Sequence, residues 1–141
     1  MTYAENTKVP VEKTKAEIER TVNKYGASAF GSFTERDRAV IVFASQNRRV
    51  RFDLPLPIGD DARADKIRRV RWRALLLCLK AKLEAVALKI ETFEEAFLSH
   101  VVLPDGTTVG THVGPHIDEA YKTGQIPPML PPLLAPPRKA S

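Results

Sequence analysis

Apolar residues near the start of the chain recur at the spacing of a helix. The set that repeats every three or four positions predicts a first helix and consists of Val11, Ile18, Val22 and Tyr25. Thr14-Lys15-Ala16-Glu17 fits a capping box, in which a Thr hydroxyl and a Glu carboxylate satisfy free backbone N–H groups at a helix start. Gly26 predicts the end of this helix, because glycine readily adopts the left-handed backbone of a C-terminal cap.

The pattern then changes to that of three strands. Residues 29–34 are aromatic and small, residues 38–44 form a nearly continuous β-branched run, and residues 49–54 alternate apolar and polar side chains. The polar breaks between them are short enough for antiparallel hairpins. The second segment is apolar on both faces, so we expect it to be the central strand. The third is apolar on one face only, which points Arg49 and Arg51 outward from the same side of the sheet.

A long helix follows the prolines at 55 and 57, and we expect it to run from about Arg63 to Ile90. When its residues are placed 100° apart, the large apolar side chains form one stripe: Trp72, Leu75, Leu76, Leu79, Leu83, Val86 and Ile90. A second stripe holds smaller residues: Ile67, Val70, Ala74, Leu77, Cys78, Ala81, Ala85 and Leu88. Two apolar faces predict a central helix that packs on its own sheet with one face. The other face is then covered by the C-terminal third or by a second copy of the protein.

The C-terminal third is predicted to hold short elements and a tail. Thr92-Phe93-Glu94-Glu95 is a second capping box, residues 101–109 place Asp105-Gly106 at the tip of a hairpin, and Gly114-Pro115 is expected to begin a last helix. From Ile126 the chain becomes a polyproline-prone tail. We therefore predict one α+β domain over residues 1–125 and a Pro-rich C-terminal tail over residues 126–141. The predicted order is N-terminal helix, three-stranded antiparallel meander, long central helix, short helix, β-hairpin and short helix.

Charge is strongly segregated along this framework. The chain has a formal net charge of +5, but residues 35–90 sum to +7, whereas residues 91–121 contain no Lys or Arg and sum to −6. Between positions 63 and 82 there are eight Lys or Arg residues and one acidic residue. Such a basic face favours a polyanion, of which nucleic acid is the obvious one. The alternative is that the two oppositely charged segments pair with each other.

The candidate nucleic-acid-binding residues of the long helix are Lys66, Arg68, Arg69, Arg71, Arg73 and Lys80. Lys66, Arg69, Arg73 and Lys80 fall within roughly 60° of one another, so they can follow a phosphate backbone for about four turns of helix. Arg49 and Arg51 enlarge this surface if the sheet lies beside the helix start. A solvated or internally paired basic face is the structural alternative.

Aromatic residues and the single cysteine have structural interpretations. Trp72 lies within the arginine cluster, and Phe30 and Phe33 lie near the first strand, so all three are candidates for base stacking. Core packing is nevertheless favoured for each of them. Cys78 lies among leucines and is expected to be a packed core thiol.

Residue types typical of metal and catalytic sites are present, but not in a productive pattern. His112 and His116 are four residues apart, yet Gly114-Pro115 between them argues against a shared helical face and hence against a metal site. There is no glycine-rich phosphate loop and no serine nucleophile elbow. The sequence therefore predicts no catalytic residue, no metal site and no cofactor, and the protein is not expected to be an enzyme.

The sequence also bears on location. A lone cysteine cannot form an intramolecular disulfide, and the N-terminus lacks the apolar core of a secretion signal. The longest apolar run, residues 74–79, is far shorter than the roughly 20 residues of a membrane span. We expect a cytoplasmic protein that does not cross a membrane.

Several short motifs are spread over residues 3–131. They include Tyr3-Ala4-Glu5-Asn6-Thr7, Val50-Arg51-Phe52, Leu54-Pro55-Leu56-Pro57, Arg71-Trp72-Arg73-Ala74-Leu75, Leu103-Pro104-Asp105-Gly106 and Pro127-Pro128-Met129-Leu130-Pro131. In these motifs the chain resembles a small family of proteins encoded by phages and prophages. The resemblance implies a phage origin and residence in the cytoplasm of a bacterial host, and it implies no particular activity.

The order of helix, three-stranded meander and long helix also resembles the double-stranded RNA-binding domain and the core of single-strand annealing proteins. This resemblance is in topology alone. The basic motif of the former family has a rough counterpart in residues 66–73, but its small-residue and lysine pattern is absent, so RNA specificity does not carry over.

Together these observations predict a nucleic-acid-binding protein of phage origin that contacts phosphates. We expect a role in DNA replication, recombination or annealing, with DNA favoured over RNA. The alternative is a protein-interaction adaptor or an inhibitor of a host system. Homo-oligomerisation through the second stripe of the long helix is a further expectation.

Overall fold

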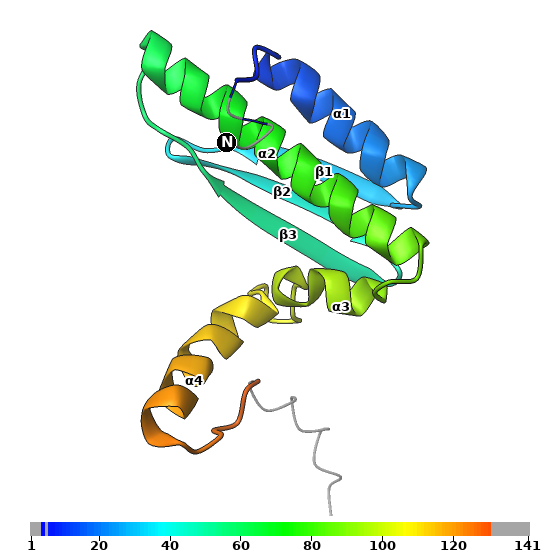
Figure 1. The fold of residues 1–141 in the computed structure, drawn as a ribbon, viewed down its shortest axis with the longest axis vertical. Coiled ribbons are helices and arrows are strands. Elements are labelled where there is room, and N and C mark those ends of the chain that lie inside the picture. Colours follow the sequence, from blue (N-terminus) through cyan, green and yellow to red (C-terminus); the bar gives the residue numbers. More distant parts are fainter. Residues whose placement is uncertain (1–3, 5, 131–141) are drawn as a thin grey trace, which may run out of the picture.

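The computed structural model describes residues 4 and 6–130 and confirms the predicted α+β class (Figure 1). Helix α1 (Val11–Lys24) is followed by strands β1 (Ala29–Thr34), β2 (Arg38–Ser45) and β3 (Arg48–Pro55), and then by helix α2 (Ala62–Ala87). Helix α3 (Phe93–Phe97), the 3-10 helix η1 (Leu98–His100) and helix α4 (Val109–Thr123) follow.

The sheet is antiparallel in the order β1-β2-β3, with β2 in the centre as predicted. Helices α1 and α2 cover the same face of it (Figure 1). Alternate residues of β2 therefore differ in burial. Ile41 and Phe43 point into the core, whereas Val40 and Val42 are only partly buried on the side that no described helix covers. We call this second side the open face.

Phe33 lies on the open face with 60% of its surface exposed, so the expectation that it packs in the core is wrong. Its register explains the result, because Phe33 pairs with Val40 and shares its side of the sheet. Phe30 projects from the opposite side of β1 and packs against the core, as expected.

The large apolar stripe of α2 forms the centre of the core. Trp72, Leu76 and Leu79 are almost fully buried in one cluster with Ile41 of the sheet, as the helical spacing predicted. Burying each such side chain contributes about 1.5–3 kcal/mol. This stripe therefore sets how α2 lies on the sheet.

Helix α3 begins with the predicted capping box. The Thr92 hydroxyl accepts from the Glu95 N–H, and the Glu95 carboxylate accepts from the Thr92 N–H. Phe97 at the other end of α3 packs edge-on against Phe43, with 5.6 Å between ring centroids and 85° between ring planes. This contact anchors the C-terminal segment to the sheet.

Helix α2 ends at Ala87, before the predicted end at Ile90. Lys89 adopts a left-handed backbone with φ 61°, and the N–H of Ile90 donates to the carbonyl of Ala85, which closes the helix. Ile90 is 73% exposed, so its predicted place on the large stripe is wrong.

The second stripe of α2 faces solvent over much of its length. Among the described residues neither α1 nor the C-terminal segment covers it, and Leu77, Cys78 and Leu88 are exposed. The prediction that Cys78 is a packed core thiol is wrong, because α1 packs on the flank of α2 that carries Arg73 and not on this stripe. Cover by a second copy stays a prediction.

Helix α1 begins at Val11, so Thr14 lies inside the helix and does not cap it. Pro10 occupies the N-cap position, and its carbonyl accepts from the Thr14 N–H. The Thr14 side chain is fully buried on the face that meets the core. The capping box predicted for Thr14 and Glu17 is therefore wrong, because the apolar face of the helix extends one turn further toward the N-terminus.

The predicted hairpin over residues 101–109 is reduced to a tight turn. A single bridge between Val102 and Thr108 closes it. A second bridge joins Val101 to Val50, which places this segment along the outer edge of β3.

Helix α4 begins at Val109 and runs through Gly114-Pro115 without interruption, so the helix start predicted at that pair is wrong. The Thr108 hydroxyl caps the helix by accepting from the Thr111 N–H, and Val109 is buried, so the helix starts earlier. From η1, α4 projects away from the sheet (Figure 1).

The predicted Pro-rich tail begins within the described chain and continues beyond it. Residues 126–130 form no helix or strand, and residues 131–141 lie outside the described residues. None of the helices that the structure describes is long and apolar enough to span a membrane.

Thr14 provides a test of this helix start. Its buried Oγ1 has no hydrogen-bond partner among the described residues. We expect Thr14→Val, which keeps the shape and removes the hydroxyl, to stabilise the protein by about 1 kcal/mol in denaturant titrations. If Thr14 were an N-cap, the same change would destabilise the protein by about 1 kcal/mol.

Candidate nucleic-acid interface

Helices α1 and α2 lie side by side and run in the same direction across the sheet (Figure 1). At one end, Pro10 and Val11 share a hollow with Arg69 of α2. At the other end, Lys24 of α1 shares a hollow with Glu84 of α2. We call the line between the two helices the helix seam.

The hollows at the two ends of the helix seam are lined largely by charged side chains. The one near the helix starts has about 310 Å³, and the one near the helix ends has about 420 Å³. Among the described residues, six cations and three carboxylates line them: Lys8, Arg20, Lys24, Arg68, Arg69 and Lys80, with Glu17, Asp65 and Glu84. The seam therefore carries a positive excess to which both helices contribute.

Glu17 lies within the seam and joins the two helices. Its carboxylate accepts a hydrogen bond from Arg73 at 2.9 Å and lies 3.7 Å from the Lys80 ammonium. The hydrogen bond from Arg73 holds the pKa of Glu17 below its ordinary value of 4.5, although burial acts in the opposite direction. The charges of Arg73, Lys80 and Arg20 add to the lowering. Glu17 thus holds α1 to α2 and neutralises part of the seam.

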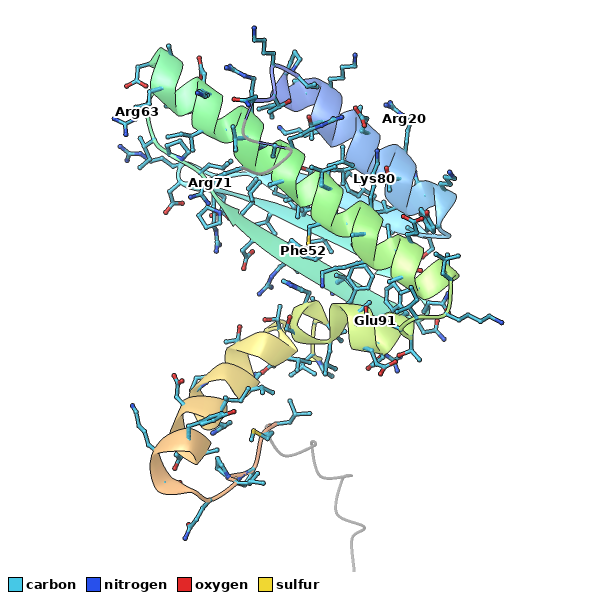
Figure 2. The ribbon with its side chains drawn as sticks, in the orientation of Figure 1. Arg20, Phe52, Arg63, Arg71, Lys80 and Glu91 are labelled. Carbon is cyan, nitrogen blue, oxygen red and sulfur yellow. The ribbon has the colours of Figure 1, made fainter. Side chains whose placement is uncertain are left out.

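The structure brings four of the predicted phosphate-binding residues to the seam side of α2: Lys66, Arg69, Arg73 and Lys80. Figure 2 shows Lys80 on the side of α2 that faces α1. Arg69 forms no ion pair within the described chain, and its buried Nε lacks a hydrogen-bond partner there. Lys66 is exposed near the start of the helix. Lys66 and Arg69 are therefore available to an anion.

Arg68 also lines the hollow near the helix starts, but its guanidinium has partners within the protein, and Arg71 lies elsewhere. The Arg68 guanidinium lies 2.8 Å from Asp65 and donates to the carbonyls of Pro57 and Gly59. These bonds hold the loop before α2, so most of its donors are used within the protein. Arg71 is exposed on the side of α2 that faces away from α1 (Figure 2). Arg71 is therefore not part of the seam.

Arg49 and Arg51, the predicted residues of β3, lie on the open face and not beside the seam. They alternate with the buried residues Val50 and Phe52, which face the helices. The Arg51 guanidinium donates to the Gly106 carbonyl at 2.8 Å and so holds the turn that precedes α4. The sheet therefore separates these two arginines from the cations of the helix seam.

The cations that α1 adds to the seam were not predicted from the sequence. Arg20 and Lys24 line the larger hollow together with Lys80. Placing α1 residues 100° apart would have revealed them, since Glu17, Arg20 and Lys24 lie three and four positions apart on one side of that helix. What the sequence did not show is that this side meets α2.

The acidic C-terminal third does not neutralise the seam. In the part of the chain that the structure describes, a single ion pair between Lys or Arg and a carboxylate joins residues 35–90 to residues 91–121, the 2.9 Å contact of Arg48 with Glu94. Arg48 lies on β3, away from the seam. The segregation of charge along the sequence is therefore retained in the fold.

His112 and His116 both lie on the uninterrupted helix α4, so the predicted break between them is wrong. His112 Nε2 lies 2.6 Å from the Thr107 hydroxyl and 3.3 Å from the Asp105 carboxylate. Its surroundings are thus those of a residue that holds the turn before the helix. No group of three potential metal ligands occurs within the described ranges.

Comparisons with protein-family models, with curated proteins and with solved structures give no match to this chain. We therefore infer a function from the arrangement of the helix seam.

The ion pairs of Glu17 predict a pH-dependent contribution to stability. Because the folded-state pKa of Glu17 lies below 4.5, its stabilising effect is present above that pH and is lost as the pH falls through the lowered pKa. We expect Glu17→Gln to lower the free energy of unfolding by about 1 kcal/mol at pH 7. Denaturant titrations should show this difference disappearing in acid. A difference that is equally large at low pH would contradict the assignment.

Proposed function

We propose that this protein binds nucleic acid through phosphates laid along the helix seam. The observation that carries the proposal is the convergence of cations from two helices on one line, where they outnumber the carboxylates. Like charges gathered in this way repel one another, and a polyanion relieves that repulsion. We propose a binding role and not a catalytic one.

The length of the seam suits a strand of several nucleotides. Lys66 and Lys80 are separated by about 21 Å along the axis of α2, since a helix rises about 1.5 Å per residue. That distance corresponds to about six phosphates of one DNA strand, which are spaced about 3.4 Å apart along the duplex axis. The starts of α1 and α2 lie at the same end, where their positive dipole ends add to the attraction.

Contacts of this kind do not select a base sequence. Lys and Arg side chains that meet phosphates fix the position of a strand, whereas sequence is read at the base edges. Within a phage-infected bacterial cell, DNA replication, recombination or annealing would present such a substrate in the cytoplasm. We therefore favour DNA over RNA.

A second candidate function, that of a protein-interaction adaptor, is favoured by the second stripe of α2. Leu77 and Leu88 are 36% and 65% exposed on it. An exposed apolar strip of this kind is typical of a protein-binding surface.

Charge reversal on the seam tests the main proposal. Single- and double-stranded DNA and RNA are titrated at several salt concentrations, with wild type and with Arg20→Glu plus Lys80→Glu. We expect the double variant to bind much more weakly and to lower the slope of log affinity against log salt by about 2.

The matched control is Arg36→Glu plus Lys122→Glu, which makes the same change in net charge at two exposed positions away from the seam. It should keep nearly all of the affinity. Equal losses in both variants would show that only overall charge matters. Absence of wild-type binding at low salt would leave the adaptor as the better candidate.

Glu17→Gln gives an opposite and more specific expectation. It removes a negative charge from the seam and releases Arg73 and Lys80 for an anion. We therefore expect affinity at low salt to rise about three- to tenfold and the salt slope to become steeper by about 1, although the protein is less stable. An unchanged or reduced affinity in a folded variant would place the phosphate path elsewhere.

A further inference from the structure

Helix α4 is an arm whose apolar side has no cover from the described residues along most of its length. Within the described chain, it packs on the body through its first turn, where Val109 is buried and Gly110 approaches Ser99 so closely that an added Cβ would lie 2.9 Å from the Ser99 carbonyl. Further along, Ile117 and Tyr121 are 42% and 88% exposed. A helix of this length draws most of its stability from packing an apolar face. We therefore expect the outer part of α4 to pack on another surface.

The open face of the sheet is a second apolar surface without cover among the described residues. A shallow hollow of about 510 Å³ lies on it, lined in part by Gly31, Phe33, Val42, Arg49 and Arg51. The Phe33 ring leans over Gly31 of the same strand, where an added Cβ would lie 3.3 Å from the ring, so the lack of a side chain at Gly31 leaves room for the ring. A sheet with one apolar face in water is normally covered by another layer.

The arm and the open face of one molecule do not meet. The turn that precedes α4 forms the rim of the hollow through Val102 and Gly106, and from there α4 projects away from the sheet (Figure 1). A layer that covers the open face therefore comes from another molecule or from residues that the structure does not describe.

Charge favours a second copy of this chain as that occupant. The open face carries Arg49, which forms no ion pair with a described residue, whereas Arg51 on the same face already lies 3.7 Å from Asp53. The arm carries Asp118 at the edge of its apolar side, about 100° around the helix from Ile117, whereas Glu119 lies on the opposite side of α4 near His116. A contact between Asp118 of one copy and Arg49 of another favours one orientation of the two apolar surfaces.

We propose that α4 of one copy packs on the open face of a second copy. If α4 of each copy packs on the open face of the other, a two-fold axis relates the two copies. Both arms and both open faces are then covered, so the assembly is a closed dimer. The contact is independent of the proposed function, because the helix seam lies on the other side of the sheet and stays accessible.

Light scattering on size-exclusion chromatography tests this dimer with the full chain. Ile117→Asp plus Tyr121→Asp on the arm, and separately Phe33→Asp on the open face, should each raise the dimer dissociation constant by at least about 30-fold. All three positions are exposed within one copy, so the variants should stay folded, which circular dichroism checks. Leu77→Asp plus Leu88→Asp on the second stripe of α2 is the matched control and should leave the dimer intact.

Cross-linking identifies the contact itself. In a Cys78→Ser background, chains carrying Phe33→Cys are mixed with chains carrying Ile117→Cys and treated with a short thiol-specific cross-linker. Cross-linked pairs should contain one chain of each kind. A monomeric wild type, or a dimer that only the Leu77 and Leu88 changes dissociate, would overturn the proposal. A monomer whose Phe33→Asp variant loses affinity for single-stranded nucleic acid would also overturn it, and would assign the open face to bases.

Discussion

Burial of the large stripe of α2 against the sheet is the packing on which the surfaces of that helix depend. Trp72, Leu76 and Leu79 can enter the core in one rotation of the helix only, and that rotation fixes where every other side chain of α2 points. The flank that carries Arg73 and Lys80 then faces α1, and the second stripe faces solvent. The charged and apolar surfaces of the molecule thus both follow from how one apolar helix face packs.

The Glu17 carboxylate has two opposing effects on the helix seam. Two parallel helices that both present cations to each other repel, and Glu17 offsets this repulsion by accepting from Arg73. The same carboxylate reduces the charge available to an external anion. Stability and anion affinity are therefore linked through Glu17, and a stronger phosphate site would be obtained at the expense of the α1–α2 contact.

Periodicity and capping predicted the framework, because the signals involved are local. The strand order, the buried face with Trp72 and the cap at Thr92 follow from spacing and from side-chain chemistry within a few residues. Where local spacing was compatible with more than one structure, long-range packing determined which one forms. Thr14 has the chemistry of a cap, but a proline N-cap one turn earlier and the burial of its own side chain place it inside α1.

Only part of the candidate site could be predicted from the sequence, again because local spacing does not specify long-range packing. Helical spacing grouped Lys66, Arg69, Arg73 and Lys80 on one edge, and they do share a side of α2. Which element lies opposite that edge depends on how α1 crosses the sheet. The spacing of residues along α2 does not indicate how α1 crosses the sheet. The contribution of Arg20 to the helix seam therefore could not be predicted from that spacing.

The two edges of the sheet are also unequal. The bridge between Val50 and Val101 occupies the outer side of β3, whereas no described strand pairs with the outer side of β1. Free backbone N–H and C=O groups at such an edge recruit strands from other chains, and this is how fibrils grow. The Val102 N–H already donates to the Arg49 carbonyl, so the end of β3 near Arg49 and Val50 is closed to an added strand, and the outer side of β1 is the edge at which a strand of another chain can pair along its whole length.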